Sequence, residues 1–221
     1  MSIFKLLALL FMATISTTMQ ANSGNYTIRT LVCSQHKELI PFVAEQRSQT
    51  FRNYPYLYQA NNLEEYAYVN WLFGLPHSMI TVVYMESKPI GFLIGTSFED
   101  FDQHFGGSRE IFLQAGLNPK NYYYFSEIII IPEYRGQHIA QKLFSNLEQQ
   151  AQALGYSAGC FVHESHNNHP LKPQDYQELD SFFQKLGYYK SPLTIDFTWP
   201  TITRDGVTIL SHTLDYWLKE F

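Results

Sequence analysis

The stretch with the strongest chemical signature is SEIIIIPEYRGQHIAQKLF, which runs from Ser126 to Phe144. The run of isoleucines predicts a buried strand, and the amphipathic run after Gly136 predicts a helix. A tight loop between a strand and a helix directs free backbone N–H groups at one point, where the helix dipole adds partial positive charge. Arg135 adds a formal charge, and Gly136 allows close approach to the backbone. The stretch therefore predicts an anion site, most naturally for phosphate.

The expected phosphate carrier is neither a nucleoside triphosphate nor a nicotinamide dinucleotide. Neither the Walker A pattern nor the dinucleotide-binding glycine pattern occurs in this loop. The structural alternative is a central strand and a capped helix without a ligand.

The cysteines and histidines form weaker patterns. Cys33 and Cys160 both lie in apolar runs, so we expect buried small hydrophobic residues and neither a disulfide framework nor a metal site. A nucleophilic Cys160 activated by His163 is the alternative. The spacing of His163, His166 and His169 would suit zinc, but loop histidines are more often simply polar, so no metal is predicted.

The elements that must position these residues follow from hydrophobic periodicity and from Gly and Pro breaks. Strands are predicted over 26–33, 79–85, 90–96, 122–131, 157–164, 193–199 and 207–217, and helices over 37–49, 61–73, 137–154 and 175–186. Residues 100–121 form an insertion of unclear structure, with Gly106-Gly107 as a candidate hinge. The order predicts one α/β domain with a mixed central sheet of about six to seven strands flanked by helices. The strand at 122–131 should be central, because it is apolar on both faces at its end.

The stretch IIIPEYRGQHIAQKLF resembles motif A of the GNAT superfamily of N-acetyltransferases, in which Arg/Gln-x-x-Gly-x-Gly/Ala holds the pyrophosphate of acetyl-CoA. Here the pattern falls on Arg135, His138 and Ala140, with His138 in place of the middle glycine. The segments YPYLYQ, FSEIIIIPEYRG, HPLKPQDYQELDSFFQKLGYY and YWLKEF together resemble one GNAT subgroup with an HPL[RK]P loop and a YPYLY segment. This likeness extends over nearly all of residues 22–221 and implies a single-domain GNAT-like fold.

The resemblance implies acetyl-CoA as the acyl donor. The pantetheine arm would lie beside the strand and bind the backbones of Ile128, Ile129 and Ile130. The pyrophosphate would lie at the following loop and first helical turn, on Arg135, Gly136, Gln137, His138, Ile139, Ala140 and Gln141.

Acetyl transfer to an amine requires a base for the ammonium proton, a donor to the thioester oxygen and an acid for the CoA thiolate. Glu127 is the candidate base, since it is the only charged residue in the strand and GNAT enzymes similar to this chain often place a glutamate there. The alternative is a glutamate that pairs with a buried arginine or caps a backbone N–H. The oxyanion donor would be a backbone N–H near Ile129 or Ile130.

The general acid stays open. In many family members, a tyrosine precedes the sequence KLG at the end of the last helix. This chain has Phe183 at that position, and phenylalanine cannot donate a proton. Tyr176, Tyr188, Tyr189 or a water could take its place.

Two segments could hold the acceptor, an amine-bearing small molecule or peptide. Tyr54, Tyr56 and Tyr58 could form a wall of the substrate pocket, with plain packing as the alternative. In HNNHPLKPQDY, the candidates for substrate contacts are His169, Lys172 and Asp175.

Composition limits the partners. The net charge is −5 and no block of Lys and Arg occurs, which argues against nucleic acid, because phosphate binding needs a basic face. The 16 tyrosines and 17 phenylalanines indicate an aromatic core or cleft. Oligomeric state stays open.

Residues 1–21, MSIFKLLALLFMATISTTMQA, have the layout of a secretory signal, and residues 22–221 would form the acetyltransferase domain. The apolar run is too short for an ordinary membrane span. A lipid-surface anchor or a later start at Met12 or Met19 are the alternatives. The protein is exported if this segment acts as a signal peptide and is otherwise cytoplasmic.

We therefore expect an acetyl-CoA-dependent N-acetyltransferase in which the amine attacks the thioester directly. The rival hypothesis is a non-catalytic CoA-binding or protein-interaction module on a GNAT fold, which His138 and Phe183 favour. An exported protein that kept the fold but lost the cofactor is a third.

Overall fold

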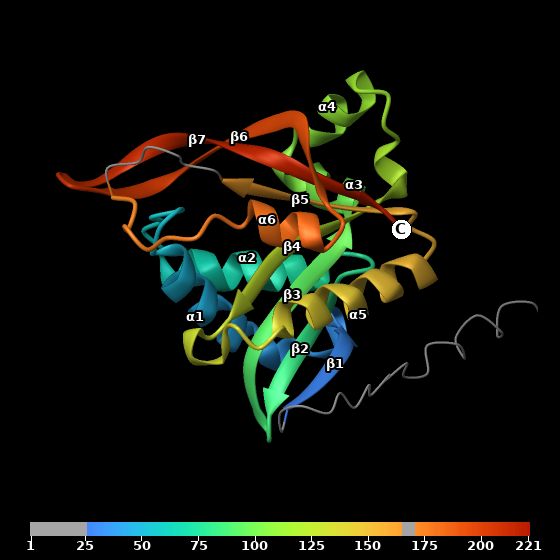
Figure 1. Cartoon of the computed structure of the whole chain (residues 1–221), viewed down its shortest axis with the longest axis horizontal. Coiled ribbons are helices and arrows are strands. Elements are labelled where there is room, and N and C mark those ends of the chain that lie inside the picture. Colours follow the sequence, from blue (N-terminus) through green and yellow to red (C-terminus); the bar gives the residue numbers. More distant parts are fainter. Residues whose placement is uncertain (1–25, 165–170) are drawn as a thin grey trace, which may run out of the picture.

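The predicted strands assemble into one mixed sheet. The computed structural model describes residues 26–164 and 171–221 (Figure 1). The strand order is β1-β2-β3-β4-β5-β7-β6, so β4 is central as predicted. Only β4 and β5 pair in parallel within this part of the chain. The strands are β1 (Tyr26–Val32), β2 (Met79–Met85), β3 (Lys88–Ser97), β4 (Tyr122–Ile130), β5 (Ala158–Glu164), β6 (Tyr189–Thr203) and β7 (Gly206–Glu220).

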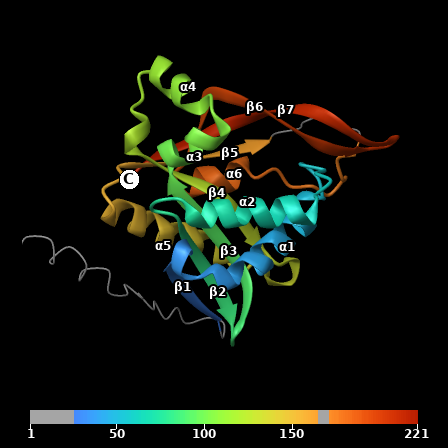
Figure 2. The ribbon, with the colours of Figure 1, turned by 180° about the vertical axis from the view of Figure 1, so that it is seen from behind.

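Helices cover both faces of the sheet. Helix α5 lies on the face seen in Figure 1, and α1 and α2 lie on the face seen in Figure 2. Short 3₁₀ turns occur at Cys33–Gln35, Lys37–Leu39, Pro119–Asn121 and Pro132–Tyr134. The α-helices are α1 (Ile40–Phe51), α2 (Asn62–Gly74), α3 (Phe98–Phe105), α4 (Ser108–Gln114), α5 (Ile139–Ala153) and α6 (Asp180–Lys185).

Each face has its own hydrophobic core. Val43 of α1 and Val69 of α2 belong to one cluster, together with Ile129 of β4. Leu143 of α5 and Phe183 of α6 belong to the other. Burial of these apolar stripes is the main force that holds the helices on the sheet.

Helix α2 begins where its sequence predicts. The Asn61 side chain accepts hydrogen bonds from the backbone N–H groups of Leu63 (3.0 Å) and Glu64 (3.5 Å). Glu64 and Glu65 lie in the first turn, where carboxylates interact favourably with the helix dipole. This cap sets the start of the helix and therefore the direction of the side chains on its buried face.

Strand β4 leaves β5 shortly after the two strands begin to pair. Only Tyr122–Tyr124 of β4 pair with β5, opposite Ala158–Cys160, whereas the pairing of β4 with β3 continues to Ile130. The register against β3 shifts at Ser126, since Ile94 pairs with Glu127 and Gly95 with Phe125. Such a bulge re-aims the side chains that follow it. It places Glu127 on the same face as Tyr124 and Ile129, which is the face covered by α1 and α2.

The β6–β7 hairpin holds the loop that precedes α2. The hairpin is longer than predicted, because the predicted strands cover only 193–199 and 207–217. The Gln59 N–H donates to the Pro200 carbonyl (2.8 Å), and the Ile202 N–H donates to the Leu57 carbonyl (2.7 Å). The segment between α1 and α2 is therefore attached to β6 by main-chain bonds.

Two segments differ from prediction. The helix expected over 175–186 covers only Asp180–Lys185, and Tyr176, which lies before it, packs its ring edge-on against Tyr54 at 4.6 Å between centroids. The insertion at 100–121 contains α4 and most of α3, with Gly106 (φ 72°) and Gly107 (φ 89°) forming the turn between these two helices. The N-terminal segment 1–21 lies outside the described residues.

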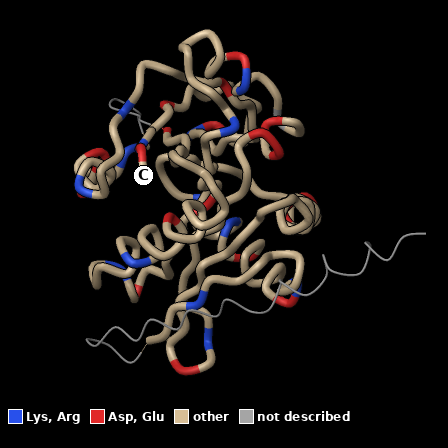
Figure 3. Tube along the Cα trace, turned by 90° about the vertical axis from the view of Figure 1, so that its right-hand side faces the viewer, with Lys and Arg blue, Asp and Glu red and all other residues tan. Residues whose placement is uncertain are grey.

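Charged residues of both signs are scattered over the described part of the chain. Figure 3 shows Lys and Arg interspersed with Asp and Glu along the trace. No helix of residues 26–164 and 171–221 combines the length and apolar character that crossing a membrane requires.

Candidate active site

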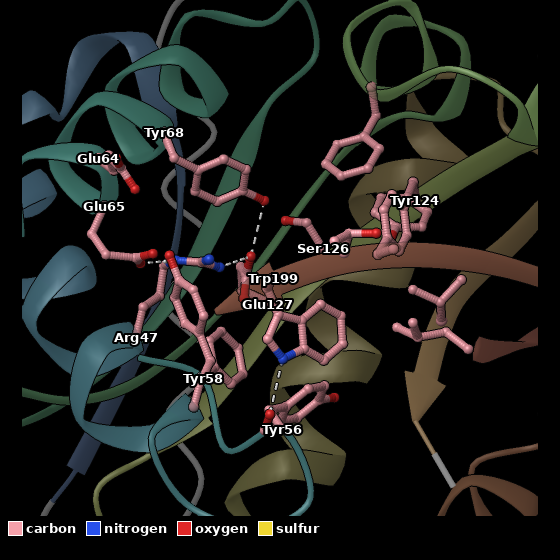
Figure 4. Close-up of a pocket in the computed structure, with 16 residues that line it drawn as sticks. Arg47, Tyr56, Tyr58, Glu64, Glu65, Tyr68, Tyr124, Ser126, Glu127 and Trp199 are labelled. Atoms are coloured by element: carbon pink, nitrogen blue, oxygen red, sulfur yellow. Dashed lines mark hydrogen bonds and ion pairs between the residues drawn. The ribbon is translucent and has the colours of Figure 1, made fainter. Parts of the chain in front are cut away.

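A cavity of about 330 Å³ lies beside β4, near the point where β4 leaves β5 (Figure 4). Ten of its sixteen lining residues are aromatic or aliphatic, so the walls are mainly apolar. The residues come from α1, α2, α3, the central strands, the hairpin and the loop before α2. They are Arg47, Phe51, Tyr56, Tyr58, Glu64, Glu65, Tyr68, Phe101, Tyr124, Ser126, Glu127, Val162, Phe197, Thr198, Trp199 and Leu214.

Glu127 belongs to a buried charge cluster in this cavity. Arg47 of α1 donates from Nη1 to Glu127 Oε1 and from Nε to Glu65 Oε2 (2.7 Å). The Tyr68 hydroxyl donates to the same Glu127 oxygen (3.0 Å), and its ring lies 4.2 Å from the Arg47 guanidinium carbon. All three charged residues are at most 9% exposed. Glu127 therefore pairs with a buried arginine, which is the alternative that the sequence left open.

The surroundings of the cluster change its protonation equilibria. Burial raises the pKa of Glu127, and this effect outweighs the opposing effects of Arg47 and of the Tyr68 hydrogen bond. Burial alone would lower the pKa of Arg47, but the negatively charged carboxylates of Glu127 and Glu65 raise it. The arrangement gives a permanently charged guanidinium beside a carboxylate with increased proton affinity, which is the property that a general base requires.

The predicted tyrosine wall is present in part. Tyr56 and Tyr58 line the cavity, whereas Tyr54 is not a lining residue and packs against Tyr176. The Trp199 indole donates to the Tyr56 carbonyl (3.0 Å), so the hairpin and the loop form this wall together.

The predicted phosphate loop lies between β4 and α5. Gly136 has φ 75°, and His138, the residue just before α5, has φ 59° and ψ 17°. His138 thus adopts a left-handed conformation that glycine accepts most easily, at the position where the resemblance expects glycine. No side chain of the described residues caps the start of α5, so its first N–H groups remain available to an anion. Arg135 donates from Nε to the carbonyl of Ile130 (2.9 Å), which ties the loop to the end of β4.

The other predicted substrate contacts do not line the cavity. Lys172 pairs with Glu178 (2.5 Å), and Asp175 is exposed. Neither belongs to the cavity wall. His166 and His169 lie outside the described residues. The zinc alternative needs both of them, so the structure does not test it.

Tyr176, Tyr188 and Tyr189, the expected substitutes for Phe183 as a general acid, do not line the cavity. Phe183 is buried against Phe161, with 4.6 Å between the ring centroids. Tyr188 is a core residue whose hydroxyl donates to Glu148 (2.8 Å), and Tyr189 is about half exposed.

The two cysteines are buried free thiols, as predicted. Burial raises the pKa of Cys160 well above its usual value, which disfavours the reactive thiolate. Cys160 and His163 are three residues apart on β5 and so point to opposite faces. The alternative of a Cys160–His163 nucleophile is therefore wrong.

Sequence reasoning missed Arg47, Glu65, Tyr68 and Trp199. A signal for two of them exists, because Arg47 shares the buried stripe of α1 with Ile40, Val43 and Ala44, and Glu65 shares that of α2 with Val69. A lone charge at an apolar position of a helix indicates a buried partner of opposite charge. Nothing comparable distinguishes Trp199.

Comparisons with known proteins agree with this architecture. The family model described as "Acetyltransferase (GNAT) family" matches residues 43–188. No curated protein matches the chain.

Solved structures with this fold are similar in shape but distant in sequence. An N-acetyltransferase from Staphylococcus aureus Mu50 has a TM-score of 0.55 at 16% identity, covering 89% of this chain and 99% of its own. A ribosomal-protein-alanine N-acetyltransferase from Brucella melitensis has a TM-score of 0.56 at 11% identity, covering 88% and 99%. A Salmonella typhimurium protein described as an acetyltransferase, solved with its cofactor acetyl-CoA, has a TM-score of 0.55 at 15% identity, covering 89% and 94%. At these identities the likeness concerns the fold alone.

Proposed function

Because the chain belongs to the GNAT family of acetyltransferases, we propose that it is an acetyl-CoA-dependent N-acetyltransferase whose acceptor amine binds in the cavity beside Glu127. One observation carries the proposal. The single strand β4 sends Glu127 into the cavity, has no β5 partner beyond Tyr124, and ends at the uncapped loop before α5. An acceptor site, a backbone edge for an extended arm and an anion site would then follow one another along this strand.

Acetyl-CoA fits the residues present at the far end of this strand. The backbones of Ile128, Ile129 and Ile130 would bind the pantetheine arm in place of a neighbouring strand. The pyrophosphate would bind to the loop and first turn of α5, from Arg135 to Gln141. A side chain at Gly136 would meet no atom within 4 Å, so the space above this glycine is open.

The residues around the cavity would carry the proton transfers. Glu127 would accept a proton from the bound ammonium, and the free amine would then form a bond to the acetyl carbon. A backbone N–H near Ile129 or Ile130 would stabilise the negative charge on the thioester oxygen. The carbon–sulfur bond breaks, and the CoA thiolate takes up a proton from a donor that no described residue supplies clearly. Arg47 would act as a positioning residue that holds the Glu127 carboxylate.

The test uses the full chain and two readouts. Calorimetry measures acetyl-CoA binding to the wild type and to Glu127→Gln, and thiol release measures transfer to a panel of amines. We expect both proteins to bind acetyl-CoA at about micromolar Kd, and only the wild type to release CoA rapidly. A folded wild type that does not bind acetyl-CoA would overturn the proposal.

A CoA-binding module without catalysis is the second candidate function. The ion pair between Arg47 and Glu127 favours it, because a paired carboxylate can have a purely structural role. Phe183 also favours it, because phenylalanine cannot act as the general acid. This alternative predicts acetyl-CoA binding of equal affinity in both proteins and no thiol release above the uncatalysed rate with any amine.

The assignment of residues 1–21 as a signal segment and of 22–221 as the catalytic domain is also a proposal. N-terminal sequencing of the mature protein tests it. Cleavage after Ala21 would support export, and an intact N-terminus would contradict it.

A further inference from the structure

The charge cluster in the cavity is unbalanced whenever Glu127 is in the deprotonated form that a base requires. Arg47 provides one positive charge, whereas Glu65 and Glu127 provide two negative charges when both are ionised. Both carboxylates are buried, and an uncompensated buried charge is costly. A bound ammonium group would supply the missing positive charge.

The walls of the cavity determine what the ammonium can be attached to. Eight of the sixteen lining residues are aromatic, among them Phe51, Tyr56, Tyr124 and Trp199. Aromatic rings offer large apolar area, and their faces also attract cations. Figure 4 shows Tyr58, Tyr68 and Trp199 around the Arg47–Glu127 pair. The cavity therefore suits an apolar body with a charged end.

The Trp199 wall is held in place before any ligand binds. Besides the Trp199–Tyr56 hydrogen bond, the indole stacks on the His212 ring, with 3.7 Å between centroids and an angle of 4°. His212 is itself bonded through Nδ1 to Glu164 (2.5 Å) and through Nε2 to Thr201 (2.7 Å). A wall fixed in this way loses little freedom when a ligand binds, so little of the binding free energy is lost in ordering it.

Size and charge exclude other acceptors. A volume of about 330 Å³ lies at the small end of the range of roughly 300–1,000 Å³ for ligand pockets, so the acceptor is compact. A carboxylate next to the amine would approach Glu65 and Glu127, and the guanidinium of Arg47 is already bonded to both. Amino acids are therefore disfavoured.

Resting on the proposed function, we infer that the acceptor is a compact primary amine with an aromatic body and no carboxylate beside the amine. The chemical class is the arylalkylamines. Amino acids, aliphatic diamines and lysine side chains of peptides are the competing classes.

The experiment compares matched amines on the full chain. We measure kcat/KM for 2-phenylethylamine, phenylalanine, 1,4-diaminobutane and a lysine-containing peptide by thiol release. Calorimetry measures binding of the same four compounds without acetyl-CoA. We expect 2-phenylethylamine to exceed each of the others by roughly tenfold or more in both readouts. Equal or greater values for phenylalanine, the diamine or the peptide would overturn the inference.

Variants at two cavity residues, Glu65 and Trp199, test the physical basis. Glu65→Gln removes one cavity charge and should narrow the preference for 2-phenylethylamine over phenylalanine by about tenfold. Glu45→Gln removes an exposed charge from α1 outside this cavity and should leave the preference unchanged. Trp199→Ala removes an aromatic wall and should reduce the preference for 2-phenylethylamine over 1,4-diaminobutane several-fold. Trp199→Phe keeps an aromatic ring and should retain most of this preference.

The two hypotheses fail differently. If no amine releases CoA but 2-phenylethylamine still binds selectively, the transferase proposal fails and the inference about the cavity stands. If CoA is released with a polar amine as the best acceptor, the transferase proposal stands and the inference fails.

Discussion

Arg47 is the residue whose loss should affect folding most. It lies between Glu65 and Glu127 and is 9% exposed. Arg47→Met leaves two buried carboxylates without their cation, so we expect the free energy of unfolding to fall by about 3–5 kcal/mol. Urea denaturation at pH 7 measures the change. Arg52→Met, at the exposed end of α1, is the control and should cost less than about 1 kcal/mol. Equal costs for the two variants would contradict this account of the cluster.

Glu127 should control the acid side of the activity profile. Its pKa is raised, chiefly by burial, so the deprotonated base form becomes populated only above the usual carboxylate range. We expect kcat/KM to rise with pH through this pKa. Glu127→Gln should lose that limb and lower kcat by about 10²–10⁴-fold. A variant with the wild-type profile would show that Glu127 only pairs with Arg47.

His163 should make the protein sensitive to acid. Burial lowers its pKa from 6.5 to about 4, so the unfolded chain binds more protons than the folded one between these values. The contribution of His163 to stability should therefore fall as pH decreases through this window, by up to about 3 kcal/mol. His163→Phe lacks this dependence, while the raised pKa of Glu164, about 8, acts on both proteins alike. Parallel stability curves for the variant and the wild type would exclude the effect.

At the scale of elements, the start of α5 offers a direct test of the unusual histidine. Because His138 has φ 59°, His138→Gly should relieve left-handed strain and raise the free energy of unfolding by up to about 1 kcal/mol. Acetyl-CoA affinity should be unchanged or higher, since the backbone keeps its path. His138→Val, with a β-branched side chain, should reduce both quantities. Loss of affinity in His138→Gly would show that the imidazole itself binds the ligand.

Most elements could be predicted because each carries its own periodic pattern. Strand β2 has its predicted bounds, Met79–Met85, and α2 begins at its predicted cap. The early part of the helix expected over 175–186 is not helical, and the contact that Tyr176 makes there with Tyr54 is tertiary and leaves no local signal in the sequence.

At the scale of the whole molecule, the fold class and the central position of β4 could be predicted, but the cavity could be predicted only in part. Glu127 and Tyr56 follow from local patterns. Arg47 and Trp199 are far apart in the sequence, and only the tertiary fold brings α1 and β6 to the same cavity. A single sequence contains no signal that these two residues come close together in the folded chain.

The short pairing of β4 with β5 also gives the sheet an edge in its interior. Beyond Tyr124, the main-chain groups of β4 that face β5 have no strand partner among the described residues, as on an outer edge strand. Their amide hydrogens should exchange with deuterium faster than the β4 amides that face β3, although all lie in the middle of the molecule. If acetyl-CoA binds along this edge, it should slow that fast set selectively. If acetyl-CoA slowed exchange equally in both sets, it would bind at a site other than this edge and stabilise the protein as a whole.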